Sequence, residues 1–480
     1  MVVDTTDEDS AAESEPGSDI RLDGPPPFLG ESISRVVWTL AWPAVALNSL
    51  QVVNTLLDRF YIGHLNEAAL TAHGAATTVM FMMFSLAVAL GTGVTAIASR
   101  AFGARNRTEV RRASRQGFRL SVLAGFVLAA VTALFSYPVA VFILPNKATE
   151  AAHQMAYFCS AYACGLPAIC MIQCLAGALR ATGDTKSPMV ISSLQIFCHI
   201  ALNTVLVPRI GLVGAGIALS ISAWISALIY VPFVSTTALG PVHHLRLPEK
   251  EWIVRILRIA VPAGAMAALR VLSLTAFTLA LKLAPNGEAA IAAMGIGFAI
   301  ESVMFMPSFG LSVAAGALVG QSLGAKDPDR AYRIGWSASH WAGIVTLALA
   351  GPIFWAAPWI AHQLLPGKPA VITEAVSLLR WLCVTEVFFA YSMVMIGALQ
   401  GAGDTVRPMR IAIAALWGMR VPMAFLLLLP AGYPILGWHL PLGAGLGAAG
   451  AWIAMSFTQL VQGVLSVIAW KRGAWRALKV

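Results

Sequence analysis

Long apolar stretches, separated by short segments rich in charge, proline or glycine, recur along almost the whole chain. Each is about 20 residues long or longer, the length that a helix needs to cross a lipid bilayer. Only 11% of the 480 residues are charged and 58% are hydrophobic, whereas an ordinary soluble domain has about 25% charged residues. Polar groups could not cover so much apolar surface, so it must face lipid. A soluble, collagen-like, disulfide-rich or disordered chain is thereby excluded.

We predict an all-α membrane protein with twelve transmembrane helices. The first six are expected at 36–61, 69–98, 117–140, 152–179, 188–208 and 212–235, and the second six at 255–282, 289–320, 335–361, 372–399, 408–430 and 444–470. This divides the chain into an acidic tail (1–33), an N-lobe (34–235), a linker (236–254), a C-lobe (255–470) and a short basic tail (471–480). The acidic tail is polar and rich in Ser and Pro, so we expect it to be disordered.

The lysine and arginine residues predict the orientation of these spans. Of the 32, 24 fall beside the two termini or after even-numbered spans, four fall on the opposite side and four lie within spans. Basic loops stay in the cytoplasm, so both termini and the linker are expected there, in a multi-pass protein of the cell inner membrane. The net charge of +9 is then explained by contact with anionic lipid, and no nucleic-acid partner is expected.

The two halves of the chain resemble each other at offsets of 219 to 221 residues. Matching segments occur in the same order, namely Leu40–Ala44 with Ile259–Ala263, Phe102–Arg105 with Leu323–Lys326, and Gly177–Thr185 with Gly397–Thr405. Because each half holds six spans, both enter the membrane in the same direction, and a pseudo-twofold axis along the membrane normal relates two six-helix bundles. This arrangement is typical of an alternating-access transporter, although a single-chain channel could share it.

Two of the repeated segments contain a Gly-Asp pair, Gly183-Asp184 and Gly403-Asp404. Glycine permits a positive φ, and aspartate can cap the helix that follows. We interpret both pairs as structural turns on the cytoplasmic side, with direct substrate contact as the alternative.

Taken together, these segments resemble the multidrug and toxic compound extrusion (MATE) family, over about residues 34 to 470. The resemblance rests on Leu57–Leu65 at the end of the first span, the paired Gly-Ala loops, the paired Gly-Asp-Thr turns, and the glycines at 214–216 and 447–450 that open spans six and twelve. The branch resembling DNA-damage-inducible protein F is the most similar. The family exports amphipathic, often cationic, organic compounds in exchange for protons or sodium. The resemblance therefore implies a monomeric antiporter without a cofactor or metal, and not an enzyme.

Ionisable residues inside the spans are the candidates for ion coupling, because each is costly in lipid. Asp58 matches the first-span carboxylate of the family. His199 and Asn203 are four residues apart and share one face of the fifth span. The related branch usually has Asn and Asp at these two positions. The missing carboxylate disfavours a sodium site, and a histidine titrates near neutral pH, so we expect coupling to protons with sodium as the alternative. A neutral, merely structural His199 stays open.

Three charged residues in the C-lobe spans, Arg270, Glu301 and Glu386, allow two interpretations. Other branches of the family have carboxylates where this chain has Arg270 and Phe389, so their second cation site is expected to be absent. Arg270 would form a buried ion pair with one of the two glutamates, or a glutamate would hold a cationic substrate.

The cysteines of the chain do not indicate a metal site or a disulfide. Four of the six cysteines lie in the fourth span without a cluster of metal ligands nearby, and we interpret them as small buried hydrophobic residues: Cys159, Cys164, Cys170 and Cys174.

Two rival functions stay open, a flippase for lipid-linked precursors and a membrane receptor that transports nothing. Few intramembrane bases argue against the flippase.

Overall fold

The structure is a computed structural model, and it describes residues 32–144, 149–242, 246–365, 367–435, 438–439 and 442–478. The expected acidic tail, apart from its last two residues, and the last two residues of the basic tail lie outside the described residues. Almost every described segment between loops is helical, because the apolar stretches satisfy their own backbone hydrogen bonds only as helices.

The N-terminal half contributes seven helices among the described residues. They are α2 (Ile33–Gly63), α3 (Glu67–Gly103), α4 (Arg107–Ile143), α5 (Thr149–Ala163), α6 (Leu166–Ala181), α7 (Lys186–Ile210) and α8 (Leu212–Ser235). The C-terminal half contributes α9 (Lys250–Lys282), α10 (Gly287–Gly324), α11 (Pro328–Leu364), α12 (Pro369–Gly401), α13 (Val406–Ala412), the π-helix η1 (Ile413–Arg420), α14 (Val421–Leu428), the two-residue strands β1 (Pro434–Ile435) and β2 (Trp438–His439), and α15 (Ala448–Lys471).

The expected twelve spans are confirmed over the described chain. Eleven helices are long and apolar enough to cross a membrane, and the bent pair α5 and α6 supplies a twelfth. Our prediction of one continuous fourth span is wrong, because the chain bends by 48° between Ala163 and Leu166. Pro167 in the first turn of α6 cannot continue the hydrogen bonding of α5. The eleventh span, Val406–Leu428, is continuous but contains the π-helix η1.

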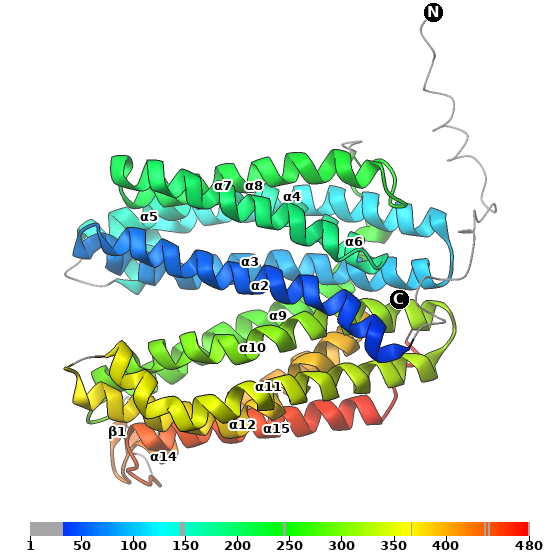
Figure 1. Cartoon of the computed structure of the whole chain (residues 1–480). Helices are drawn as coiled ribbons and strands as arrows, with labels where there is room; N and C mark the ends of the chain where they lie inside the picture. Colours follow the sequence, from blue (N-terminus) through cyan, green and yellow to red (C-terminus); the bar gives the residue numbers. More distant parts are fainter. Residues whose placement is uncertain are drawn as a thin grey trace, which may run out of the picture.

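The helices form two bundles, the N-lobe with α2–α8 and the C-lobe with α9–α15 (Figure 1). The start of α2 and the end of α15 lie at the same end of the molecule, which we call the termini side (Figure 1). Helix α2 connects the lobes. Val37 and Leu40 near its start belong to the hydrophobic core of the C-lobe, whereas Ile62 near its end belongs to a core of the N-lobe.

The lobes touch on the termini side where α3 and α10 cross. A Cβ atom on Gly103 would lie 1.9 Å from the carbonyl oxygen of Gln321, and one on Gly324 would lie 2.0 Å from the carbonyl oxygen of Arg100. Gly103 and Gly324 are the equivalent glycines of the repeated Gly-Ala loops. These glycines therefore permit a symmetric backbone-to-backbone contact between the two lobes.

Hydrogen bonds between the lobes surround this crossing. Arg100 donates from Nη2 to the carbonyl of Ala402 at 2.9 Å, and Gln321 donates from Nε2 to the carbonyl of Ala181 at 2.9 Å. Arg100 and Gln321 are equivalent in the repeat, and each reaches the Gly-Asp turn region of the opposite lobe. Arg100 Nη1 also donates to the carbonyl of Leu478 at 2.6 Å. The termini side is thus closed by a reciprocal set of contacts.

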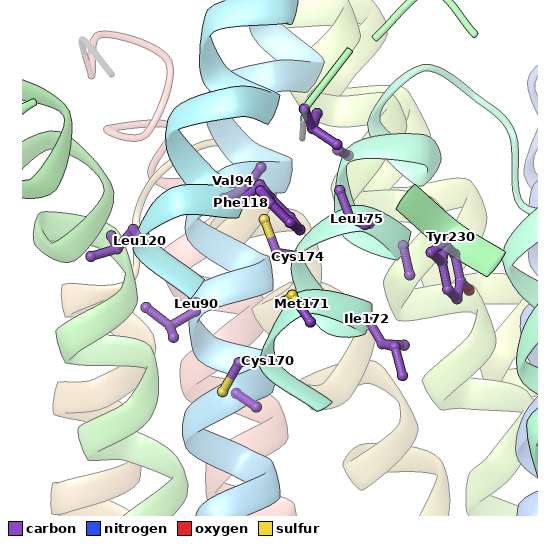
Figure 2. Packing of buried hydrophobic residues seen from close by; sticks show 14 of the residues in the cluster. Leu90, Val94, Phe118, Leu120, Cys170, Met171, Ile172, Cys174, Leu175 and Tyr230 are labelled. Carbon is purple, nitrogen blue, oxygen red and sulfur yellow. The ribbon is translucent and has the colours of Figure 1, made fainter. Parts of the chain in front are cut away.

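The cysteines of the fourth span are placed by the core of the N-lobe. Cys159, Cys170 and Cys174 are buried, whereas Cys164, at the bend, is exposed. Figure 2 shows Cys174 beside Val94 and Phe118, and Cys170 farther along α6 in the same core cluster. The expectation of buried, hydrophobic cysteines is therefore wrong for Cys164, because the bend turns its position away from the core.

Candidate functional site

Polar residues of α2 and α7 meet in the N-lobe near the ends of these helices that lie away from the termini side. Asn203 donates from Nδ2 to Asp58 Oδ1 at 2.6 Å. His199 Nδ1 lies 3.8 Å from the same carboxylate oxygen. The side chain of Asp58 is 17% exposed and that of His199 3% exposed. The three residues singled out in the sequence as coupling candidates are therefore brought together in one partly buried cluster.

A fourth member of this cluster, Asn54, was not identified from the sequence. It lies one helical turn before Asp58 on α2 and donates from Nδ2 to Asp58 Oδ2 at 3.5 Å. Its Oδ1 is 3.0 Å from His199 Nδ1. A polar residue four positions before the carboxylate, in an apolar helix, was the signal that could have revealed it.

The hydrogen bonds of His199 favour one protonation state of the imidazole. Asn54 Oδ1 can only accept, so His199 Nδ1 carries a hydrogen and donates to it. Asn203 Nδ2 can only donate, so His199 Nε2, 3.2 Å away, accepts. These roles follow from the assigned orientation of the two amides. His199 is thus a neutral bridge that orients the two asparagines around Asp58.

One acceptor in the cluster is left without a partner. Asn203 Oδ1 is buried and accepts no hydrogen bond among the described residues. A buried acceptor of this kind is costly unless a donor reaches it in some state of the protein. A protonated Asp58 would be such a donor, provided that the Asn203 amide turns over.

In the C-lobe, Glu301 on α10 and Glu386 on α12 lie close enough to interact electrostatically. Gln459 on α15 donates from Nε2 to Glu301 Oε1 at 3.2 Å and accepts from Thr385 Oγ1 at 2.8 Å. The two glutamates and Gln459 therefore belong to one polar cluster inside the C-lobe.

The expected ion pair of Arg270 with Glu301 or Glu386 is not formed. Within the described residues, no oxygen of either carboxylate lies within the 4.0 Å of an ion pair from Arg270. The guanidinium of Arg270 instead lies over the ring of Phe389, 5.9 Å from its centroid. Arg420, the last residue of η1, is the cation that interacts electrostatically with Glu301. It also donates from Nε to Thr458 Oγ1 at 3.0 Å.

The two Gly-Asp turns have the geometry of helix caps. Gly183 and Gly403 have φ values of 92° and 82°. Asp184 Oδ1 accepts from the backbone N–H of Ser187 at 2.9 Å, and Asp404 pairs with both the backbone and the guanidinium of Arg407. The aspartates thus hold the starts of α7 and α13. The carbonyls of Ala181 and Ala402, just before the two turns, accept the hydrogen bonds from the opposite lobes.

Side chains that could bind a metal ion are not clustered in the part of the chain that the structure describes. Among the residues that the structure describes, no group of three or more His, Cys, Asp or Glu side chains could hold a metal ion. The Asp58 cluster offers a carboxylate and amides, which suit a proton or a weakly bound small cation.

Comparison with known proteins gives the same architecture. The chain is 27% identical over 457 residues to the probable multidrug resistance protein NorM of Thermotoga maritima, covering 92% of this chain and 93% of that protein. It is 26% identical over 421 residues to the probable multidrug resistance protein YoeA of Bacillus subtilis, covering 82% and 87%. A solved outward-facing multidrug resistance MATE family transporter of the MOP superfamily superposes with a TM-score of 0.84 at 20% identity, covering 94% and 98%.

The family assignment rests on the repeated halves themselves. The MatE family profile matches residues 43–205 and again residues 262–426. These two segments fall in the N-lobe and the C-lobe, and together they cover more than half of the chain. The closer relation to the branch resembling DNA-damage-inducible protein F stays a prediction. With its twelve spans and its two matching halves, the chain belongs to the MatE family of multi-pass membrane proteins.

Proposed function

We propose that the chain is a secondary active exporter of amphipathic organic compounds that exchanges them for protons at Asp58. The names of the relatives support drug extrusion. The observation that carries the choice of proton is that the cluster around Asp58 has a single carboxylate, beside two amides and a neutral imidazole. A sodium ion would prefer two carboxylates together with neutral oxygens.

The unpartnered acceptor of Asn203 provides a place for the proton's hydrogen bond. When Asp58 takes up a proton, its carboxyl can donate to Asn203 Oδ1 once the amide turns over, and the short contact from Asn203 Nδ2 is lost. The cluster joins α2 to α7, and α2 begins in the core of the C-lobe. Protonation therefore changes α2, a helix that packs in the cores of both lobes as α9 also does, which gives a physical route from proton binding to movement of the lobes.

The driving force is sufficient for such a cycle. Each elementary charge that moves down the membrane potential supplies about 2.3 kcal/mol per 100 mV. We propose that protons enter from the side opposite the termini, that the closed contacts at Gly103 and Gly324 separate so that the lobes open toward the termini side, and that this side is the cytoplasm.

Asp58→Asn tests this function directly. The amide keeps the size of the side chain but cannot exchange a proton, so efflux of a dye from proteoliposomes driven by a proton gradient should fall to the level of empty vesicles. The matched control is Glu251→Gln, which neutralises an exposed carboxylate at the start of α9 and should transport normally. Full proton-driven efflux by Asp58→Asn would refute the proposal. Efflux driven by a sodium gradient, with the proton gradient collapsed, would establish the sodium alternative.

A further inference from the structure

A row of aromatic rings in the C-lobe ends on an arginine. The rings of Phe309 and Phe305 on α10 have centroids 6.0 Å apart, and Phe305 stacks on Phe389 of α12 at 5.7 Å with an interplanar angle of 26°. The guanidinium of Arg270, on α9, lies over the next ring, Phe389, at 5.9 Å. Three helices thus contribute to one continuous surface of three rings and one cation, which we call the aromatic-arginine patch (Phe305, Phe309, Phe389 and Arg270).

The patch faces the inside of the C-lobe rather than lipid. Leu272 and Leu279 are 49% and 60% exposed and lie on the outer face of α9. Arg270 is two positions from one and nine from the other, which on an α-helix places it about 160° to 180° away, on the opposite face. All four residues of the patch are nevertheless partly exposed. The four side chains are therefore partly accessible and not sealed off by the surrounding protein.

The charge of Arg270 is not matched by a nearby anion of the protein. Arg420, and not Arg270, is the cation that interacts electrostatically with Glu301. Among the described residues Arg270 has no carboxylate partner. A guanidinium within a transmembrane bundle normally pairs with an anion, and here the protein does not supply one.

We propose that the aromatic-arginine patch is a substrate subsite that binds amphipathic compounds carrying a carboxylate on an aromatic ring system. Arg270 would bind the carboxylate through two parallel N–H···O bonds, a geometry that guanidinium favours. The substrate's ring would pack against the row of phenylalanines by offset stacking. This inference rests on the proposed export function, and it departs from the expectation of cationic substrates, since among compounds with a positive charge the patch would favour those that also carry a carboxylate.

The test uses two probes that differ in a single charge. Rhodamine B has a free carboxylate on its aromatic system, and its ethyl ester keeps the rings but lacks that charge. Binding of each to the purified full chain in detergent is measured by fluorescence anisotropy. Arg270→Gln removes the guanidinium from the patch. Arg380→Gln is the matched control, because Arg380 is an exposed residue of the same lobe that lies over Phe354 at 5.7 Å and not over a ring of the patch.

We expect the wild type to bind the acid about tenfold or more tightly than the ester, because a charge-assisted hydrogen bond is lost in the ester. Arg270→Gln should abolish this preference while still binding the ester, which also shows that the variant is folded. Arg380→Gln should keep the preference, and Arg270→Lys should keep only part of it. Equal affinity of the wild type for both probes, or an unchanged preference in Arg270→Gln, would overturn the inference.

Transport measured in parallel separates this inference from the proposed function. A wild type that prefers the acid in binding but moves neither probe under any gradient refutes the export function alone. Proton-driven efflux of the ester without a preference for the acid refutes the subsite alone.

Discussion

The crossing of α3 and α10 makes a quantitative prediction about the equilibrium between conformations. Adding a Cβ atom at Gly103 places it 1.9 Å from the carbonyl oxygen of Gln321, whereas ordinary contact begins at 3.4 Å. The carbonyl would have to retreat by about 1.5 Å, and it cannot do so by rotating a side chain because it is backbone. Gly103→Ala and Gly324→Ala should each destabilise the state that is closed on the termini side.

The magnitude follows from the cost of overpacking. Inserting one methyl group into a tight contact costs about 1–3 kcal/mol. If the open state carries no such clash, the ratio of open to closed molecules rises by about 5- to 150-fold. Gly74→Ala and Gly295→Ala are the matched controls, because these glycines occupy equivalent positions on the same two helices and have no atom within 4 Å of the added Cβ.

Double electron–electron resonance (DEER) between spin labels on the two lobes would measure this shift. Suitable labelling positions are Lys186 and Val406, which are exposed, equivalent in the repeat and located on the termini side. The native cysteines would be replaced by alanine. We expect a longer distance to gain population in Gly103→Ala and Gly324→Ala and to be unchanged in the controls. Distance distributions identical to the wild type in both folded variants, or equal shifts in the controls, would refute the reasoning.

Three further predictions follow from the polar clusters and the core. His199→Gln should retain most proton-driven efflux, since an amide can also donate to Asn54 and accept from Asn203; loss to the level of Asp58→Asn would identify His199 as a proton carrier. Arg420→Met should lower the free energy of unfolding by about 1.5–3 kcal/mol, because it removes a charge-assisted hydrogen bond to the buried hydroxyl of Thr458, and a thermal unfolding curve unchanged from the wild type would contradict that role. Cys170→Ser should cost about 1–3 kcal/mol by burying a hydroxyl in an apolar core, whereas Cys164→Ser at the exposed bend should stay within about 0.5 kcal/mol; equal melting temperatures for the two would contradict this account.

Hydropathy and self-comparison predicted the spans and the two halves because both depend on the sequence alone. Lipid requires a minimum length of apolar helix, and a duplicated gene keeps its landmarks in order. The break in the fourth span was missed because Cys164, Gly165 and Pro167 are apolar or small and do not interrupt the hydropathy, although a proline early in a helix signals a start. The position of Pro167 could have been used to place the bend.

The site was predictable only where its partners share a helix or a family pattern. His199 and Asn203 are one turn apart, and Asp58 matches a known position, so their cluster could be anticipated. Which cation faces Glu301 could not, because it depends on the path of the eleventh span. The π-helix η1 ends at Arg420, and such local insertions change which face a side chain occupies. Arg270, expected to neutralise a glutamate, lies over the ring of Phe389 instead.

The bond from Arg100 to the carbonyl of Leu478 has a practical consequence for work on this protein. Leu478 is held in place by a short segment in which Trp475 stacks on Trp470 with ring centroids 4.1 Å apart. A change that displaces Leu478, such as Trp475→Ala, would therefore also weaken the hydrogen bond that Arg100 makes on the termini side. The segment after α15 is thus a second place, besides the glycine crossing, at which the closed contacts between the lobes can be altered.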